Sequence, residues 1–131
     1  MLSIQQVYAL CQPLTDAYIT FSNEEFDVAE CGNKHKSAYI PKYDMICLNI
    51  SEIEENALLY NLPKSRMLLY ILLHEIGHSL DPNILTEEDT ITLEETAWKI
   101  ADYLMDKLRL PKAKDYLIVR QSALDTYMKK E

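Results

Sequence analysis

Apolar and polar residues follow a helical spacing over most of the 131-residue chain. Ser3 followed by Gln6 is typical of a capping box, in which two side chains bond reciprocally to the first backbone amides of a helix. Ser51 and Glu54 repeat this pattern and predict a second helix start. Five helices are predicted, at about residues 4–11, 51–60, 63–80, 90–108 and 111–128, with Thr92 as the alternative start of the fourth.

Two segments in the first half of the chain have the composition of strands instead. Residues 18–21 (YITF) are β-branched or aromatic, which predicts a short strand. Residues 37–50 contain two alternating runs on either side of residues 41–44, a pattern that indicates a β-hairpin. The polar residues 23–36 predict a turn between them. The predicted fold class is therefore α+β, one mostly helical domain over residues 1–131 with a small sheet packed beside the helix at 63–80.

Composition narrows the classes of function. The formal net charge is −8, which disfavours proteins that bind nucleic acid through a basic face and proteins that attach to anionic membranes. The three cysteines, Cys11, Cys31 and Cys47, are an odd and widely spaced set, unlike a disulfide framework. The first residues carry neither a basic segment nor a continuous apolar one. A cytoplasmic protein with no membrane and no nucleic-acid partner is expected.

The helix predicted at 63–80 combines an apolar run with the sequence HEIGH. His74 and His78 are four residues apart, so on a helix they lie on one face, one turn apart. Two imidazoles in this arrangement can bind one Zn²⁺ ion, and Glu75 beside them can accept a proton from the water that the ion activates. The alternative is a core histidine held by a hydrogen bond. A pair of histidines with a glutamate between them favours the metal site.

Gly77 within this motif and Asp81 after it each have two interpretations. Gly77 lowers helix stability by about 1 kcal/mol relative to alanine, so it indicates either a close backbone approach beside the metal or tight packing with no chemical role. Asp81 is suited either to a helix-end position or to orienting a ligand imidazole, and a plain Asp-Pro helix stop is at least as good an interpretation.

The third ligand must come from elsewhere in the chain. No histidine follows His78, and the one remaining histidine, His35, precedes the predicted hairpin. The helix at 90–108 offers Glu94 and Glu95. With Ala97 at the centre of its apolar face, Glu94 falls about 60° away and Glu95 about 160° away, since each residue turns a helix by about 100°. Glu94 is the predicted ligand, against the alternatives that it pairs with a lysine or arginine, or that Glu95 binds; Glu95 can also close a capping box with Thr92.

HEIGH together with the later spacing E-x-x-A-x-x-I-A-x-x-L, from Glu94 to Leu104, resembles the ImmA/IrrE family of small zincin metallopeptidases. The resemblance covers about residues 37–108; Ile100 replaces the usual aromatic residue. It implies a zincin-like domain in which His74, His78 and Glu94 bind Zn²⁺ and Glu75 is the catalytic base. It also implies a protein or peptide substrate; in some family members, encoded by phages and mobile elements, this is a transcriptional repressor.

Two other functions are compatible with the same residues. One is a catalytically silent zincin-fold protein that acts as an adaptor by protein–protein contact. The other is a small helical interaction protein without a metal. The intact Glu75 favours the peptidase, because a purely structural metal site has no need of a base.

The substrate-binding elements are less specific in the sequence. The predicted strand at 45–49 is expected to hold an extended substrate along its edge. Cys31 and His35 have the spacing C-x-x-x-H, best explained by chance because no further ligands are near. The apolar stripe of the last helix is expected to be core or a partner-binding face. It consists of Tyr116, Val119, Ala123, Leu124 and Tyr127. The candidates for stabilising the oxyanion are Tyr39, Tyr43, Tyr70, Tyr103, Tyr116 and Tyr127.

Overall fold

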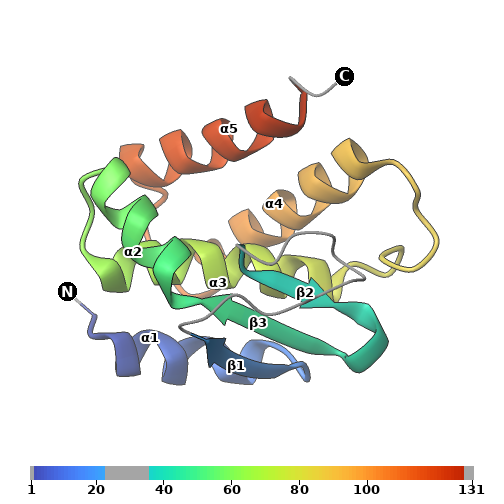
Figure 1. Cartoon of the computed structure of the whole chain (residues 1–131), viewed down its shortest axis with the longest axis horizontal. Coiled ribbons are helices and arrows are strands. Elements are labelled where there is room, and N and C mark those ends of the chain that lie inside the picture. Colours follow the sequence, from blue (N-terminus) through green and yellow to red (C-terminus); the bar gives the residue numbers. More distant parts are fainter. Residues whose placement is uncertain (1, 23–35, 129–131) are drawn as a thin grey trace.

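A computed structural model describes residues 2–22 and 36–128, and it is a mixed α+β fold (Figure 1). The chain begins with helix α1, a 3-10 turn and strand β1, continues through a hairpin of β2 and β3, and ends with four helices. Their bounds are α1 Ile4–Cys11, η1 Gln12–Leu14, β1 Tyr18–Ser22, β2 Ala38–Ile40, η2 Pro41–Tyr43, β3 Met45–Asn49, α2 Ile50–Leu59, α3 Lys64–Leu80, α4 Thr90–Lys107 and α5 Lys114–Met128.

The helix starts depend on caps, of which the sequence predicted only some. The capping box of Ser3 and Gln6 is confirmed. The prediction for Ser51 was wrong, because Asn49 is the N-cap of α2 and its side chain accepts the Glu52 amide proton. The capping box of Thr92 was also wrong. Asp89 is the N-cap of α4 and accepts the Thr92 amide proton, which fixes the start at Thr90. Helix α5 begins at Lys114 rather than at Pro111.

The sheet has the order β1-β3-β2, with β3 in the centre. The predicted hairpin is confirmed: β2 pairs antiparallel with β3, through η2 and a left-handed Asp44. Strand β1 pairs parallel with β3, a pairing that the sequence did not predict. The expectation that the edge of 45–49 binds substrate is therefore wrong, since β3 already has a partner on both sides and the outer strands are β1 and β2.

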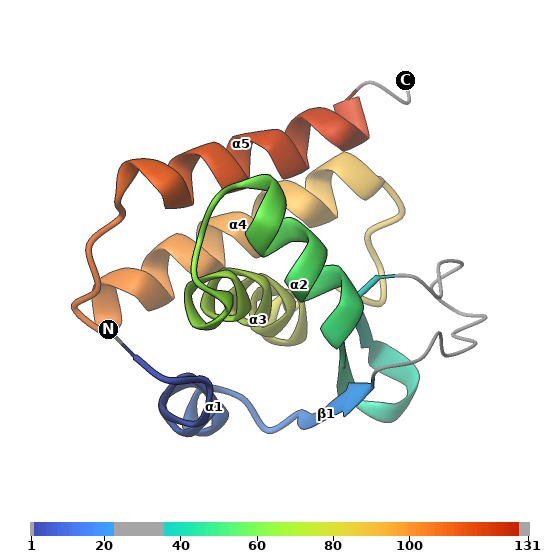
Figure 2. The ribbon, with the colours of Figure 1, turned by 60° about the vertical axis from the view of Figure 1, so that its left-hand side comes forward.

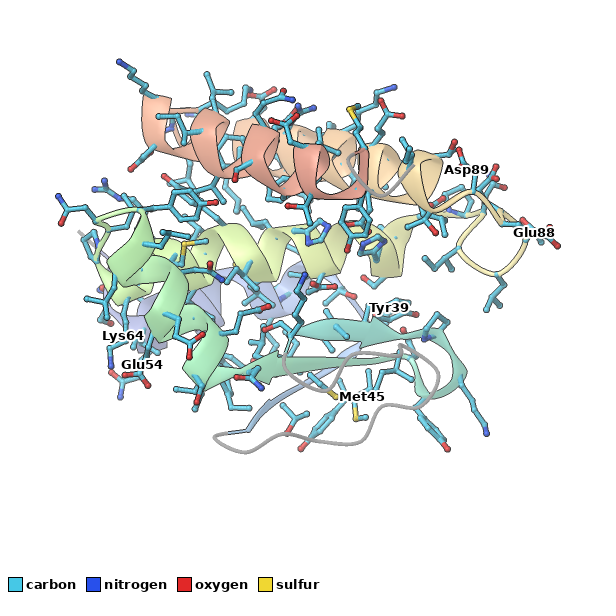
Figure 3. All side chains as sticks on the ribbon, turned by 45° about the horizontal axis from the view of Figure 1, so that its top comes forward. Tyr39, Met45, Glu54, Lys64, Glu88 and Asp89 are labelled. Carbon is cyan, nitrogen blue, oxygen red and sulfur yellow. The ribbon has the colours of Figure 1, made fainter. Side chains whose placement is uncertain are left out.

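The two faces of the sheet lie against different surroundings, as the alternation of side chains requires. Ile46 and Leu48 point to the main core and are fully buried. Tyr39, opposite Ile46 on β2, packs against the same core, on the side that faces α3 in Figure 3. Met45 and Cys47 belong to a second, small apolar cluster with Ile40. The main face thus fixes the sheet against α3.

Helix α3 is the centre of the fold. Figure 2 looks nearly along it and shows α1, α2, α4 and α5 arranged around it. Its apolar residues point in all directions, and Leu72, Leu73 and Ile76 are fully buried, as expected of a helix without a solvent face. At its start, Lys64 pairs with Glu54 of α2 at 3.3 Å (Figure 3).

Gly77 lets α4 lie directly on α3. A Cβ atom at this position would lie 2.3 Å from the backbone oxygen of Ala97 and 3.0 Å from its carbonyl carbon. Because the obstacle is backbone, no side-chain rotation could relieve the clash. Both interpretations of Gly77 expect this close backbone approach, which also brings the first turns of α4 to the HEIGH segment.

Polar contacts hold α5 against the other helices. Asp115 accepts hydrogen bonds from Arg66 and from the Tyr70 hydroxyl, each at 2.8 Å. The Tyr116 hydroxyl donates to Asp102 of α4 at 2.6 Å. These bonds fix the C-terminal helix above α3 and α4. Within the described residues, no helix is long and apolar enough to cross a membrane.

Candidate metal centre

His74 and His78 lie on adjacent turns of α3, on the side that faces α4. Their ring centroids are 4.7 Å apart. The His74 ring stacks on Trp98 of α4 at 4.6 Å with an interplanar angle of 14°. Both imidazoles are mostly buried, with side-chain exposures of 14% and 11%. Trp98 thus fixes the plane of the His74 ring, a role that the sequence analysis did not assign.

Glu94 of α4 completes a three-residue cluster with the two histidines. Its Oε1 lies 3.1 Å from Nε2 of His74, and its Oε2 lies 2.6 Å from Nε2 of His78. Glu94 is buried, whereas Glu95 is only partly so. Periodicity therefore identified the glutamate that points inward. The predicted alternative partner, a lysine or arginine, is not what Glu94 contacts among the described residues.

Glu75 is a second buried carboxylate at the same place. Its Oε2 lies 3.4 Å from Nδ1 of His74, and its side chain is 7% exposed. Ligand atoms of His74, Glu75 and His78 all lie within 4.8 Å of one another. The geometry separates the two carboxylates in their contacts with the two histidines: Glu94 contacts the Nε2 atoms of both, while Glu75 contacts Nδ1 of His74.

The electrostatics of the cluster favour positive charge. Burial by itself lowers the pKa of His74, but the charge of Glu75 and the hydrogen bonds with Glu75 and Glu94 raise it to about 10. Burial by itself raises the pKa of Glu94, but the hydrogen bonds with both histidines hold it well below its usual range. Two buried carboxylates beside two imidazoles thus form a strongly negative pocket whenever the imidazoles are neutral.

Asp81 ends α3, and none of its hydrogen bonds to the described residues joins its carboxylate to an imidazole. Its carboxylate accepts the Asn83 amide proton at 2.9 Å, and its own amide bonds to the His78 carbonyl. The helix-stop interpretation agrees with these bonds.

Nδ1 of His78 is buried and has no hydrogen-bond partner within residues 2–22 and 36–128. Cys31 and His35, the candidates for a second site, lie outside the described residues. Cys11 is a buried thiol, and burial raises its pKa to about 12.

The structure separates the six candidate tyrosines. The hydroxyls of Tyr70 and Tyr116 donate to Asp115 and Asp102, and the hydroxyl of Tyr39 donates to Asp44. Tyr43 and Tyr103 are exposed. Tyr127 of α5 lines the same cavity as His74, Glu75 and Glu94. Burial raises its pKa, and so do the charges of Glu94 and Glu75 and its hydrogen bond to Glu94.

The cavity beside the cluster has a volume of about 210 Å³ and is lined by four helices, α2 to α5. Glu52 of α2 faces it, and burial raises the pKa of this carboxyl group. The apolar stripe of α5 has two roles: Tyr116 and Leu124 are core, while Val119, Ala123 and Tyr127 line the cavity. A second cavity of about 240 Å³ lies beside Tyr70 and Met105 and contains none of the cluster residues.

Comparison of the chain with protein-family models, with curated protein sequences and with solved structures finds no match in any of the three.

Proposed function

We propose that this protein is a zinc-dependent metallopeptidase of the zincin type, which hydrolyses a peptide bond in a protein substrate. The observation that carries the proposal is the single buried carboxylate of Glu94 in contact with Nε2 of His74 and of His78. The second buried carboxylate, Glu75, supplies the base that such a site needs.

The donor set fits zinc in chemistry and in charge. Two imidazole nitrogens and one carboxylate form one of the common sets of protein ligands in catalytic zinc sites, which keep a further position for water. Ligand atoms around a tetrahedral zinc ion lie about 3.3–3.4 Å apart. The separation of 3.1 Å between Glu94 and Nε2 of His74 is close to this spacing. The separation of 2.6 Å to Nε2 of His78 is a hydrogen-bond distance, so this pair would have to move apart to bind an ion. A divalent cation would also neutralise the two buried carboxylates.

When bound, the ion supplies Lewis acidity, which polarises the scissile carbonyl and makes the attacking water more acidic. Glu75 accepts the proton of that water and returns it to the nitrogen of the departing amine. Its position supports this role, because Glu75 lines the cavity and contacts His74 only through Nδ1, away from the shared Glu94 carboxylate.

Tyr127 is the proposed donor to the oxyanion. Its hydroxyl lies at the cavity beside Glu94, and phenol hydrogen bonds suit an oxygen on which negative charge develops. Burial and the nearby carboxylates keep the phenol protonated. Its one proton bonds to Glu94 in this structure, and Tyr127 would donate it to the oxyanion instead once Glu94 binds the ion.

Tyr127→Phe is expected to lower kcat about 100-fold, with little change in KM and in bound zinc, because one oxyanion donor contributes about that factor. The exposed Tyr103→Phe is the matched control and should match wild type. Steady-state kinetics and metal analysis measure both. Equal kcat in Tyr127→Phe and wild type would remove Tyr127 from the mechanism, and loss of zinc in Tyr127→Phe would assign it to holding Glu94 instead.

The proposal also includes where the substrate binds and which kind of protein it is. Strand β2 is an outer strand that packs against α3, and Ser37 immediately before it lines the cavity, so β2 is the edge along which an extended substrate is best placed. The resemblance of the zinc-binding residues to the ImmA/IrrE family supports a transcriptional regulator of a phage or mobile element as substrate, and the cytoplasm as the place of action.

The experiment that tests the function is capture with the Glu75→Gln variant, followed by cleavage. Proteins retained by zinc-loaded Glu75→Gln are incubated with wild-type protein, with and without a chelator, and fragments are identified by mass spectrometry. The proposal expects one retained protein to be cut at a defined bond only without chelator. Retained proteins that stay intact with zinc-loaded wild type would support an adaptor instead.

A further inference from the structure

The cavity beside the cluster runs along α3 as a pocket with a closed end. Met67, Ile71 and His74 follow one another at three- and four-residue intervals, so they lie along one stripe of this helix. On α2, Asn56 and Tyr60 line the opposite wall. The pocket therefore extends from the proposed metal site toward the start of α3.

A hydrogen bond closes the far end. The Tyr60 hydroxyl donates to Oγ of Ser122 at 2.7 Å, which joins α2 to α5 across the pocket. Both residues line the cavity. This bond narrows the far end, so a side chain is best placed to enter from the side of His74 and Glu75.

The walls and the mouth differ in chemistry. The inner wall is mixed: Met67, Ile71, Val119 and Ala123 are apolar, and Asn56, Tyr60 and Ser122 are polar. Three carboxylates, Glu52, Glu75 and Glu94, line the end near the histidines, where Lys36 is the basic residue among the lining residues. A charged side chain would lose its hydration on entering the inner part of the pocket, whereas an apolar side chain would gain free energy from burial.

The volume of the cavity limits the size of the side chain that it can hold. An engineered apolar cavity of about 150 Å³ holds one benzene molecule, and this pocket has about 210 Å³. It is large enough for the ring of phenylalanine or tyrosine, and a small side chain would leave most of it empty.

We propose that this pocket binds one large uncharged side chain, best an aromatic one, of the residue next to the scissile bond. This inference rests on the proposed peptidase function for its meaning, but the pocket itself can be tested without catalysis.

The binding test uses p-cresol, which has the ring and hydroxyl of a tyrosine side chain. In methyl-labelled protein, p-cresol should shift the signals of Ile71, Val119 and Ala123 in a saturable manner. Ala123→Leu fills the pocket and should weaken binding at least 10-fold. Ala9→Leu, the same change on the exposed side of α1, should leave it unchanged. Ile71→Ala, at a partly exposed position, is a second variant that should not unfold the protein. It should change the shifts that p-cresol causes at Val119 and Ala123.

Absence of these shifts in folded wild-type protein would overturn the inference, as would equal binding by Ala123→Leu. The cleavage test uses a mixed peptide library with zinc-loaded wild type, and it should show one position enriched in Phe, Tyr, Leu and Met and depleted in Asp and Glu. Cleavage without such a preference would refute the pocket as the determinant of specificity and leave the peptidase intact. Binding of p-cresol with no cleavage of any peptide or captured protein would refute the peptidase and the occupant together, while the cavity remains.

Discussion

Glu75→Gln is expected to abolish measurable hydrolysis, with a loss of about 10²–10⁴-fold, because a positioned general base contributes about that factor to such reactions. Glutamine has the size and shape of glutamate but accepts no proton at neutral pH. It can still contact Nδ1 of His74, which Glu75 approaches to 3.4 Å. Zinc content should therefore stay at the wild-type value, and the unfolding temperature should stay within about 3 °C.

The matched control is Glu55→Gln, the same substitution at an exposed position of α2. It should leave hydrolysis, zinc content and stability unchanged. Single-turnover kinetics on the captured substrate measure the chemical step for all three proteins. If Glu75→Gln hydrolyses the substrate at the wild-type rate, Glu75 is not the base and the mechanism fails; if it loses zinc, Glu75 is a ligand.

Gly77→Ala is expected to destabilise the folded protein. The added methyl group would lie 2.3 Å from the Ala97 backbone oxygen, so α4 must move away from α3. Overpacking of this kind costs about 1–3 kcal/mol or more, and the helix propensity of alanine offsets about 1 kcal/mol of it. Because the obstacle is backbone, the cost should lie at the upper end of this range, which leaves a net loss of about 2 kcal/mol in the free energy of unfolding.

The same displacement should weaken zinc binding, because α4 carries Glu94 to both histidines. Urea unfolding of metal-free protein separates the stability effect from the metal effect. Leu80→Ala, at an exposed position of the same helix, is the control and should change the free energy by less than about 1 kcal/mol. A more stable Gly77→Ala would show that the two helices have room to adjust.

Local patterns in the sequence were sufficient to predict most helices and strands of the fold. The Ser3–Gln6 box lies within one helical turn, and the hairpin at 37–50 is a short-range pairing, so both leave a signal in adjacent residues. The parallel pairing of β1 with β3 joins Tyr18 to Met45, and no short-range pattern records such a contact. The caps Asn49 and Asp89 were missed because other cap-forming residues, Ser51 and Thr92, lie two and three positions later.

The residues of the candidate site also fall into two groups, those that the sequence predicts and those that only the packing of helices brings together. The histidines and Glu75 are fixed by helical spacing, and the choice of Glu94 over Glu95 follows from the apolar face of one helix. Trp98 lies one turn after Glu94 on that face, so the sequence did contain a signal for it. Glu52 and Tyr127 reach the cavity only because α2 and α5 pack against α3 and α4, and spacing along the chain carries no information on that packing.

The most direct measurement is the zinc affinity of wild type, Glu94→Ala and Glu95→Ala, by competition with a chelating dye after zinc loading. One zinc ion should bind per wild-type chain, and its loss in His74→Ala would assign it to this cluster. Glu94→Ala should bind at least about 100-fold more weakly, since even residues that only orient a ligand contribute about 10–100-fold. Glu95→Ala should match wild type. No zinc in the loaded wild type, or a larger loss in Glu95→Ala than in Glu94→Ala, would contradict the ligand set of His74, His78 and Glu94.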